Sequence, residues 1–359
     1  MRIFCVLSIL WCGCVTSEKY LLTRKGNMLV TSVGSVVSDT FGVYSVSREY
    51  LQENARTIAD NFHVELDAQV HILGKRSIGW HLQRITGSNS QYYRYNTTGS
   101  CHTNPNVIVN TYILDTGIDV THPQFGGRAK WLTNFADTLD TDCQGHGTHV
   151  AGLVGSKDYG VCVDANLFAV KVLDCNGSGS LSGVIKGIEF VYKQHTTAAQ
   201  NENKRTSSII NMSLGGGNSR ALDNVVNAVV QSSSDFYVIV AAGNENEDAC
   251  HGSPSGAKHA FAVMASDRND NRAYFSNFGK CGAIYSPGVD IISTMPGGKT
   301  DIYSGTSMAT PIVVGALNIY IHKYNNSSIK ILNKLTKRAF KRVIKNNQKN
   351  TPNLLLHVI

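Results

Sequence analysis

Three side chains that lie far apart in the sequence have the types needed for nucleophilic catalysis. Asp115 follows an apolar stretch, His146 stands between two glycines, and Ser307 lies ahead of a second apolar stretch. A serine hydroxyl is a weak nucleophile until an imidazole takes its proton, and the resulting imidazolium needs a carboxylate to orient and stabilise it. Each residue alone has an ordinary structural explanation, such as a helix cap for Ser307. The three together predict acyl-transfer chemistry.

The elements around these residues predict where they meet. Near-continuous apolar stretches typical of buried strands occupy residues 107–114, 167–173, 208–214, 236–242 and 259–265, and helical spacing occupies residues 146–154, 182–194 and 221–232. This alternation predicts an α/β fold with a parallel sheet covered by helices on both faces. Such sheets carry their chemistry at the carboxyl ends of the strands. Because Asp115 ends a strand while His146 and Ser307 begin helices, we expect all three at one edge of the sheet.

The helix that follows Ser307 contains a proline. The apolar run continues with helical spacing to Tyr320, and proline is tolerated in a first turn, where no intrahelical hydrogen bond is lost. We therefore expect the helix to begin close to Ser307, with Pro311 in its first turn. His149, one turn after His146, is expected to pack in the core.

The N-terminus predicts secretion. Residues 1–17 combine a charged start, an apolar stretch from Ile3 to Val15 and small residues, which is typical of a signal peptide. No other apolar run approaches the roughly 18 residues that cross a bilayer, so we expect an extracellular protein without a membrane span. Outside the signal peptide, six of the nine cysteines remain (Cys101, Cys143, Cys162, Cys175, Cys250 and Cys281). An even set in an oxidising compartment predicts disulfides, with fifteen full pairings open.

The net charge of +7 is concentrated near the C-terminus. From Ile321 onward there are nine Lys or Arg residues and no Asp or Glu, and apolar residues recur at helical spacing (Ile331, Leu332, Leu335, Ala339, Phe340 and Val343). This pattern predicts an amphipathic surface helix with its lysines in solvent, rather than a nucleic-acid or membrane patch.

The chain divides into two parts of different character. Residues 18–73 combine short strand-like stretches with one helical stretch from Arg48 to Asn61, which predicts a small α+β unit. A polar stretch around residues 74–77 links it to the larger part, residues 74–359.

Several motifs in that larger part resemble those of subtilisin-like serine proteases. They read YILDTGIDVTHPQF, GHGTHVAG, INMSLGGG, VAAGNEN, YFSNFGKCG and SGTSMATP, while VLDCNGSGSLSGVIKGIEFV is similar to the branch with proteinase K and aqualysin. The chain order Asp, His, Ser also matches subtilisins. The resemblance covers Trp80 to the C-terminus and implies a three-layer fold with a mostly parallel central sheet.

The resemblance also implies roles for individual residues. Asp115, His146 and Ser307 would form the triad, and Asn244 would donate its side-chain amide to the oxyanion together with the Ser307 N–H. The substrate backbone would pair as an added strand with two stretches, represented by Ser178, Gly179 and Leu181 and by Ser213, Leu214, Gly215 and Gly216. The wall for the residue before the cleaved bond (P1) would run over residues 214–217 and 241–243, including Ala242 and Gly243. Because these stretches contain no acidic residue, we expect broad specificity with an apolar or aromatic P1 preference.

Disulfides and cofactors follow from the same resemblance. It implies the bonds Cys143–Cys175 and Cys250–Cys281 and leaves Cys101 and Cys162 either bonded to each other or free. No cofactor is required for the chemistry. Ala283 stands where the family commonly has a calcium-binding aspartate, which leaves a structural calcium ion open. Ile312 replaces the usual histidine after Pro311, which we interpret as repacking beneath the helix.

Residues 18–73 resemble the inhibitory propeptide of the family. We expect this segment to act as an intramolecular inhibitor, removed by a cut near Ile72–Leu73 or, by another protease, after Lys75–Arg76. The overall expectation is a secreted, monomeric serine endopeptidase acting on proteins and peptides. The alternatives are an inactive homologue that acts as a binding protein, and a dedicated processing protease of basic sites.

Overall fold

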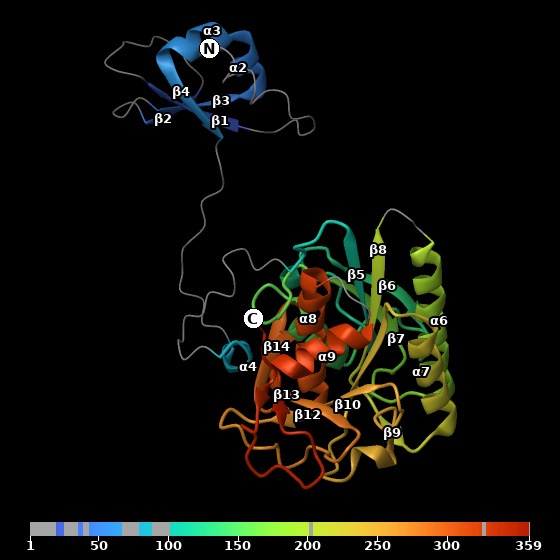
Figure 1. Ribbon diagram of the computed structural model, residues 1–359. Helices are drawn as coiled ribbons and strands as arrows, with labels where there is room; N and C mark the ends of the chain where they lie inside the picture. Colours follow the sequence, from blue (N-terminus) through green and yellow to red (C-terminus); the bar gives the residue numbers. More distant parts are fainter. Residues whose placement is uncertain are drawn as a thin grey trace. The chain divides into compact units, whose positions relative to one another are not determined.

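The structure is a computed structural model that describes residues 19–24, 35–38, 43–66, 79–87, 101–200, 204–324 and 328–358. The chain forms two compact units, Met1–Lys75 and Arg76–Ile359 (Figure 1), and each is described by itself. The predicted signal peptide and both predicted propeptide cleavage positions lie outside the described residues. In the part of the chain that is described, no helix is both long and apolar enough to cross a bilayer.

The first unit is a four-stranded antiparallel sheet with two short helices. Its sheet has the order β2-β3-β1-β4, and its elements are β1 (Lys19–Arg24), β2 (Ser35–Ser38), β3 (Val43–Ser47), α2 (Arg48–Glu53), α3 (Ala55–Asn61) and β4 (Phe62–Leu66). Leu22, Val46, Leu51, Ile58 and Phe62 form its core. The prediction of one helix from Arg48 to Asn61 was wrong, because Asn54 leaves helical geometry (φ −115°, ψ 17°) and separates α2 from α3.

A nine-stranded sheet organises the second unit. Its order is β16-β17-β13-β12-β10-β8-β5-β7-β6, and the strands are β5 (Val107–Asp115), β6 (Ala129–Asn134), β7 (Asn166–Lys171), β8 (Arg205–Met212), β10 (Phe236–Ala241), β12 (Phe261–Ser266), β13 (Gly282–Pro287), β16 (Phe340–Lys341) and β17 (Leu354–Leu355). Every pairing is parallel except that of β16 with β17. The predicted α/β fold with a mostly parallel sheet is confirmed.

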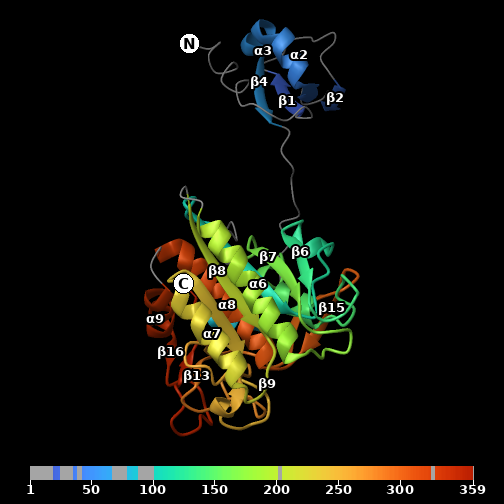
Figure 2. The ribbon, with the colours of Figure 1, turned by 90° about the vertical axis from the view of Figure 1, so that its right-hand side faces the viewer.

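Helices cover both faces of this sheet. On one face α5 (His146–Gly155) and α8 (Thr306–Tyr324) pack against side chains such as Ile113. On the other face lie α6 (Leu181–Ala199) and α7 (Arg220–Ser232), as Figure 2 shows. These two helices pack against side chains such as Leu114. Successive residues of β5 thus point into different cores, as the alternation of side chains along a strand requires. This double coverage explains why the central strands are largely apolar.

The remaining elements of the second unit are short or lie at the edges of the sheet. They are α4 (Trp80–Ile85), η1 (Pro123–Phe125), β9 (Gly216–Gly217), η2 (Ala249–His251), β11 (Gly252–Ser253), β14 (Ile291–Met295), β15 (Lys299–Tyr303) and α9 (Ser328–Arg338). The predicted C-terminal amphipathic helix exists as α9 but ends earlier than expected. Phe340 lies in β16 and pairs with Leu355, because the chain there joins the edge of the sheet.

Candidate active site

Asp115 lies at the carboxyl end of a central strand. β5 is flanked by β7 and β8, and the Asp115 side chain is fully buried. One carboxylate oxygen, Oδ1, accepts a hydrogen bond from the Thr116 N–H at 2.8 Å. A buried carboxylate is costly unless it is paired or hydrogen-bonded. Besides the Thr116 N–H, the Asp115 carboxylate has a histidine as its partner.

His146 supplies that partner from the first turn of α5. Its Nδ1 lies 2.8 Å from Asp115 Oδ1 and 3.0 Å from Oδ2. Gly147 permits this contact, since a Cβ there would overlap the Gly117 carbonyl oxygen at the end of β5. With Nδ1 held by the carboxylate, Nε2 is the ring nitrogen left for a reacting group, and 22% of the His146 side chain is exposed.

The pKa of His146 is raised above its ordinary value. Burial alone disfavours the imidazolium and lowers this pKa, but the charge of Asp115, its hydrogen bond to the ring and the charge of Asp142 together outweigh that penalty. His149, one turn later, behaves differently. It is buried, its Nε2 lies 3.1 Å from Ile291 O, and burial lowers its pKa to about 4. It therefore stays neutral in the core.

Asp142 is a buried carboxylate that supports the start of α5. Its Oδ1 accepts from the Thr116 hydroxyl at 2.8 Å and from the Gly145 N–H at 2.7 Å, and its Oδ2 accepts from the Thr148 N–H at 2.8 Å. These bonds satisfy free N–H groups at the helix start and join α5 to the loop after Asp115. The sequence analysis missed this role, because a capping side chain is expected directly before a helix, where Gly145 stands, and Asp142 lies three residues before that position.

Ser307 lies in the first turn of α8, one residue after the helix begins. Its hydroxyl donates to Ser213 O at 3.1 Å, not to His146, so the structure joins Asp115 to His146 by a hydrogen bond but does not join Ser307 to the imidazole. Catalytic hydrogen bonds are often incomplete in the absence of substrate. Thr306 N is already satisfied by Asn244, so the helix start itself is capped by that side chain.

The prediction that Pro311 lies in the first turn was wrong. It lies in the helix interior, where it cannot donate to the carbonyl four residues earlier, which belongs to Ser307. The Ser213 hydroxyl donates to Ser307 O at 2.8 Å instead. Ser213 and Ser307 thus exchange two hydrogen bonds, each using its side chain and its backbone carbonyl.

Two donors converge beside Ser307. The Asn244 side-chain oxygen accepts from both the N–H and the hydroxyl of Thr306, each at 2.9 Å, which turns its amide nitrogen toward the other side. A Cβ built on Gly305 would lie 3.6 Å from Asn244 Nδ2 and 3.6 Å from Ser307 N. Both nitrogens therefore lie close to one small region beside Gly305, and an oxyanion site needs two such donors near one point.

A fully buried lysine at the end of β7 links the segments that follow β5, β6 and β7. Lys171 Nζ donates to Thr116 O and Leu173 O, each at 2.9 Å, and lies 3.3 Å from Asp137 Oδ2. Burial alone would raise the pKa of Asp137, but hydrogen bonds, the first from the Leu139 N–H, and the charge of Lys171 lower it overall. The sequence analysis gave this lysine no role, since it stands inside an apolar strand pattern.

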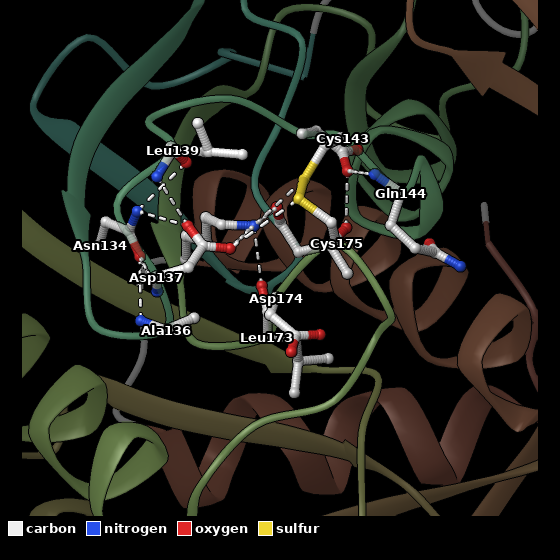
Figure 3. A network of polar contacts seen from close by, with 12 residues as sticks. Asn134, Ala136, Asp137, Leu139, Cys143, Gln144, Leu173, Asp174 and Cys175 are labelled. Atoms are coloured by element: carbon white, nitrogen blue, oxygen red, sulfur yellow. Dashed lines mark hydrogen bonds and ion pairs between the residues drawn. A yellow bond between two sulfur atoms is a disulfide. The ribbon is translucent and has the colours of Figure 1, made fainter.

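The disulfide Cys143–Cys175 lies next to this network (Figure 3). It joins the segment before α5 to the segment after β7. Disulfides also link Cys250 to Cys281 and Cys101 to Cys162, so the pair left open by the sequence is bonded. Two groups with metal-like spacing contain these cysteines, one with His102 and Asp164 and one with Asp137. Their sulfurs are in disulfides, which removes the thiolate that a metal would need.

All the predicted substrate-binding residues line two cavities that share residues 214–217. The larger, about 790 Å³, contains His146 together with Ser178, Gly179, Leu181, Ser213, Leu214, Gly215 and Gly216. The smaller, about 320 Å³, contains Ser307 and Asn244 together with Leu214, Gly215, Gly216, Ala242 and Gly243. The sequence analysis described this second wall as free of acidic residues. Glu245 and Glu247, which follow the expected stretch, also line it.

Comparisons with known proteins agree with this arrangement. A model of the Subtilase family (Peptidase_S8) matches residues 108–358. The chain is 45% identical over 282 residues to the subtilisin-like serine protease Rho m 2.0101 of Rhodotorula mucilaginosa, over 76% of this chain and 77% of that relative. It is 51% identical over 208 residues to Subtilisin-like protease 6 of Arthroderma benhamiae, over 58% of this chain, so it spans about half (50%) of that relative's length.

A solved structure is also similar. It is described as the crystal structure of a cold adapted subtilisin-like serine proteinase, and it superposes with a TM-score of 0.69 and 36% identity over 79% of this chain and 99% of that chain. The strand order and the two helical layers are therefore those of a known fold.

Proposed function

Because the chain belongs to the subtilase family, we propose that it is a serine endopeptidase that hydrolyses peptide bonds through an acyl-enzyme. The observation that carries the proposal is the contact between His146 Nδ1 and Asp115 Oδ1 at 2.8 Å. This contact favours the tautomer in which Nδ1 carries the proton and Nε2 can accept one. Ser307, which would give that proton, lines the smaller cavity.

The reaction would proceed in two balanced halves. Ser307 Oγ rotates away from Ser213 O, bonds to the substrate carbonyl carbon and gives its proton to His146 Nε2. As the C–N bond breaks, that proton passes to the leaving amine and an ester on Ser307 remains. Water then attacks the ester, His146 takes its proton, and the same proton returns to Ser307 as the acid leaves.

Asp115 and the oxyanion donors would lower the barrier. The Asp115 carboxylate orients the ring and stabilises the imidazolium, which is consistent with the raised pKa of His146. Negative charge that develops on the carbonyl oxygen would be met by Asn244 Nδ2 and the Ser307 N–H. The proximity of both nitrogens to one small region beside Gly305 supports this role.

Substrate would bind along the larger cavity as an added strand. Main-chain pairing with the stretches at Gly179 and Gly215 gives affinity without strong sequence preference. This supports action on many proteins and peptides. Secretion, a monomeric state and an inhibitory role for residues 18–73 belong to the same proposal. The compact first unit, with its own core, supports a separately folded propeptide.

The decisive experiment compares the secreted protein with its Ser307→Ala variant. We expect hydrolysis of a denatured protein substrate and labelling at Ser307 by an irreversible phosphonate, both lost in the variant. A protein that binds peptides but is neither labelled nor active would be an inactive homologue. N-terminal sequencing of the mature product would report both the signal and the propeptide cuts.

A further inference from the structure

The smaller cavity carries negative charge beside the proposed nucleophile. Glu245 Oε2 accepts hydrogen bonds from the Asn244 N–H and from Asn277 Nδ2, each at 2.8 Å. These neutral donors orient the carboxylate but leave its charge uncompensated. Glu247 lines the same cavity, and both glutamates are exposed to solvent.

Basic side chains do not offset this charge. Among the residues that the structure describes, neither Glu245 nor Glu247 forms an ion pair. The lining, taken over the same described part of the chain, contains one histidine, His251, and no lysine or arginine. The cavity is therefore an acidic pocket in an otherwise basic protein.

The position of this cavity assigns it to one substrate residue. The carbonyl that Ser307 attacks belongs to the P1 residue, and the side chain of that residue is attached to the adjacent Cα. It must enter a space bordered by Ser307 and the oxyanion donor Asn244. Of the two cavities, the smaller one is lined by both residues.

We propose that this cavity binds a lysine or arginine side chain at P1, an inference that rests on the proposed function. The methylene groups would lie along the apolar wall at Ala241 and Ala242, as the stems of long basic residues do. The cationic end would meet the carboxylates of Glu245 and Glu247. This replaces the apolar or aromatic preference, which was based only on the two stretches without acidic residues.

The chain itself contains a matching sequence. Lys75 and Arg76 stand where the two units divide. A basic P1 preference would allow the enzyme to cut its own linker there without another protease.

A matched pair of substrates isolates the charge. Peptides that differ only in lysine or norleucine at P1 have nearly the same shape, so the ratio of their kcat/KM values measures the electrostatic contribution. Two partly solvated carboxylates should favour lysine roughly three- to tenfold. The ratio should fall as salt is raised, because exposed charges are screened.

Variants test the assignment to the two glutamates. Glu247→Gln should lower the lysine-to-norleucine ratio about two- to fivefold. Glu189→Gln is the matched control, since Glu189 is exposed on α6 and pairs with Lys193, and it should leave the ratio unchanged. A peptide with the sequence of residues 70–80 offers basic and apolar P1 positions in one substrate. We expect cleavage after Lys75 or Arg76 rather than after Leu73.

The outcomes separate the two proposals. If substrates are hydrolysed with equal rates for lysine and norleucine, or the linker peptide is cut mainly after Leu73, the acidic-pocket inference is overturned while the proposed function stands. If no substrate is hydrolysed by mature protein, the proposed function falls and takes the inference with it.

Discussion

Replacing Ser213 with alanine tests how a proline is accommodated in the helix that carries the proposed nucleophile. Pro311 has no N–H for Ser307 O, and the Ser213 hydroxyl donates to that carbonyl at 2.8 Å. Ser213→Ala leaves the carbonyl without its donor at a largely buried position. An unsatisfied buried acceptor costs about 1–3 kcal/mol, so we expect the free energy of unfolding to fall by that amount.

A double-mutant cycle separates this effect from the other contact of Ser213. The Asn211 side chain also donates to the Ser213 hydroxyl at 3.0 Å, and that bond is lost in every variant that carries Ser213→Ala. Pro311→Ala restores the N–H that a regular helix directs at Ser307 O. We therefore expect it to offset part of the Ser213→Ala loss, with a coupling energy of about 1 kcal/mol or more.

The assay is guanidinium unfolding of the four proteins, each carrying Ser307→Ala to prevent self-digestion. The coupling energy is the deviation of the double variant from the sum of the single ones. If the effects of Ser213→Ala and Pro311→Ala on the free energy of unfolding simply add, the Ser213 hydroxyl does not substitute for the missing helix N–H. That result would refute the explanation of how α8 tolerates Pro311.

Three further predictions concern the catalytic rim. Asp115→Asn should lower kcat/KM about 10⁴-fold. Because the Asp115 carboxylate raises the pKa of His146, the acidic limb of the pH–rate profile of this variant should move to lower pH. An acidic limb at the wild-type pH would contradict this reasoning. Gly305→Ala should fold normally, since its Cβ meets no atom closer than 3.6 Å, yet lower kcat at least about tenfold by crowding the oxyanion site; wild-type turnover would argue against that site. Lys171→Met should reduce the free energy of unfolding by about 3 kcal/mol, because it leaves Asp137 and two backbone carbonyls without their cation. Denaturant titration measures this loss. A loss below about 1 kcal/mol would mean that the buried ion pair adds little to stability.

The sequence was sufficient for the fold class because its signals are local. Strands such as β10 and β12 are continuously apolar over most of their length, a pattern that arises when both faces of a parallel sheet are covered. The position of Asp115 at a strand end and of His146 at a helix start could be derived from the same patterns. Two helix boundaries were wrong: the helix expected over residues 48–61 divides at Asn54, and α9 ends at Arg338.

Local patterns could not reveal what depends on partners distant in the chain. Pro311 was expected in a first turn because no sequence rule indicates that Ser213, far earlier in the chain, supplies the missing donor. Lys171 received no role from the sequence, because the Thr116 carbonyl and the Asp137 carboxylate that contact it come from segments it meets only in the fold.

The lining of the smaller cavity likewise divides into residues found from the sequence and residues found only in the fold. Sequence alone identified which side chains could perform the chemistry and that a parallel sheet would bring them to one edge, because strand direction and helix starts follow from local periodicity. The further groups that surround them, including Glu245 and Glu247, became known only from the folded chain. A cavity wall is formed by side chains that converge in space, whatever their separation along the chain. The electric field of charged side chains acts over a few ångströms, so it depends on this spatial arrangement and not on the order of residues.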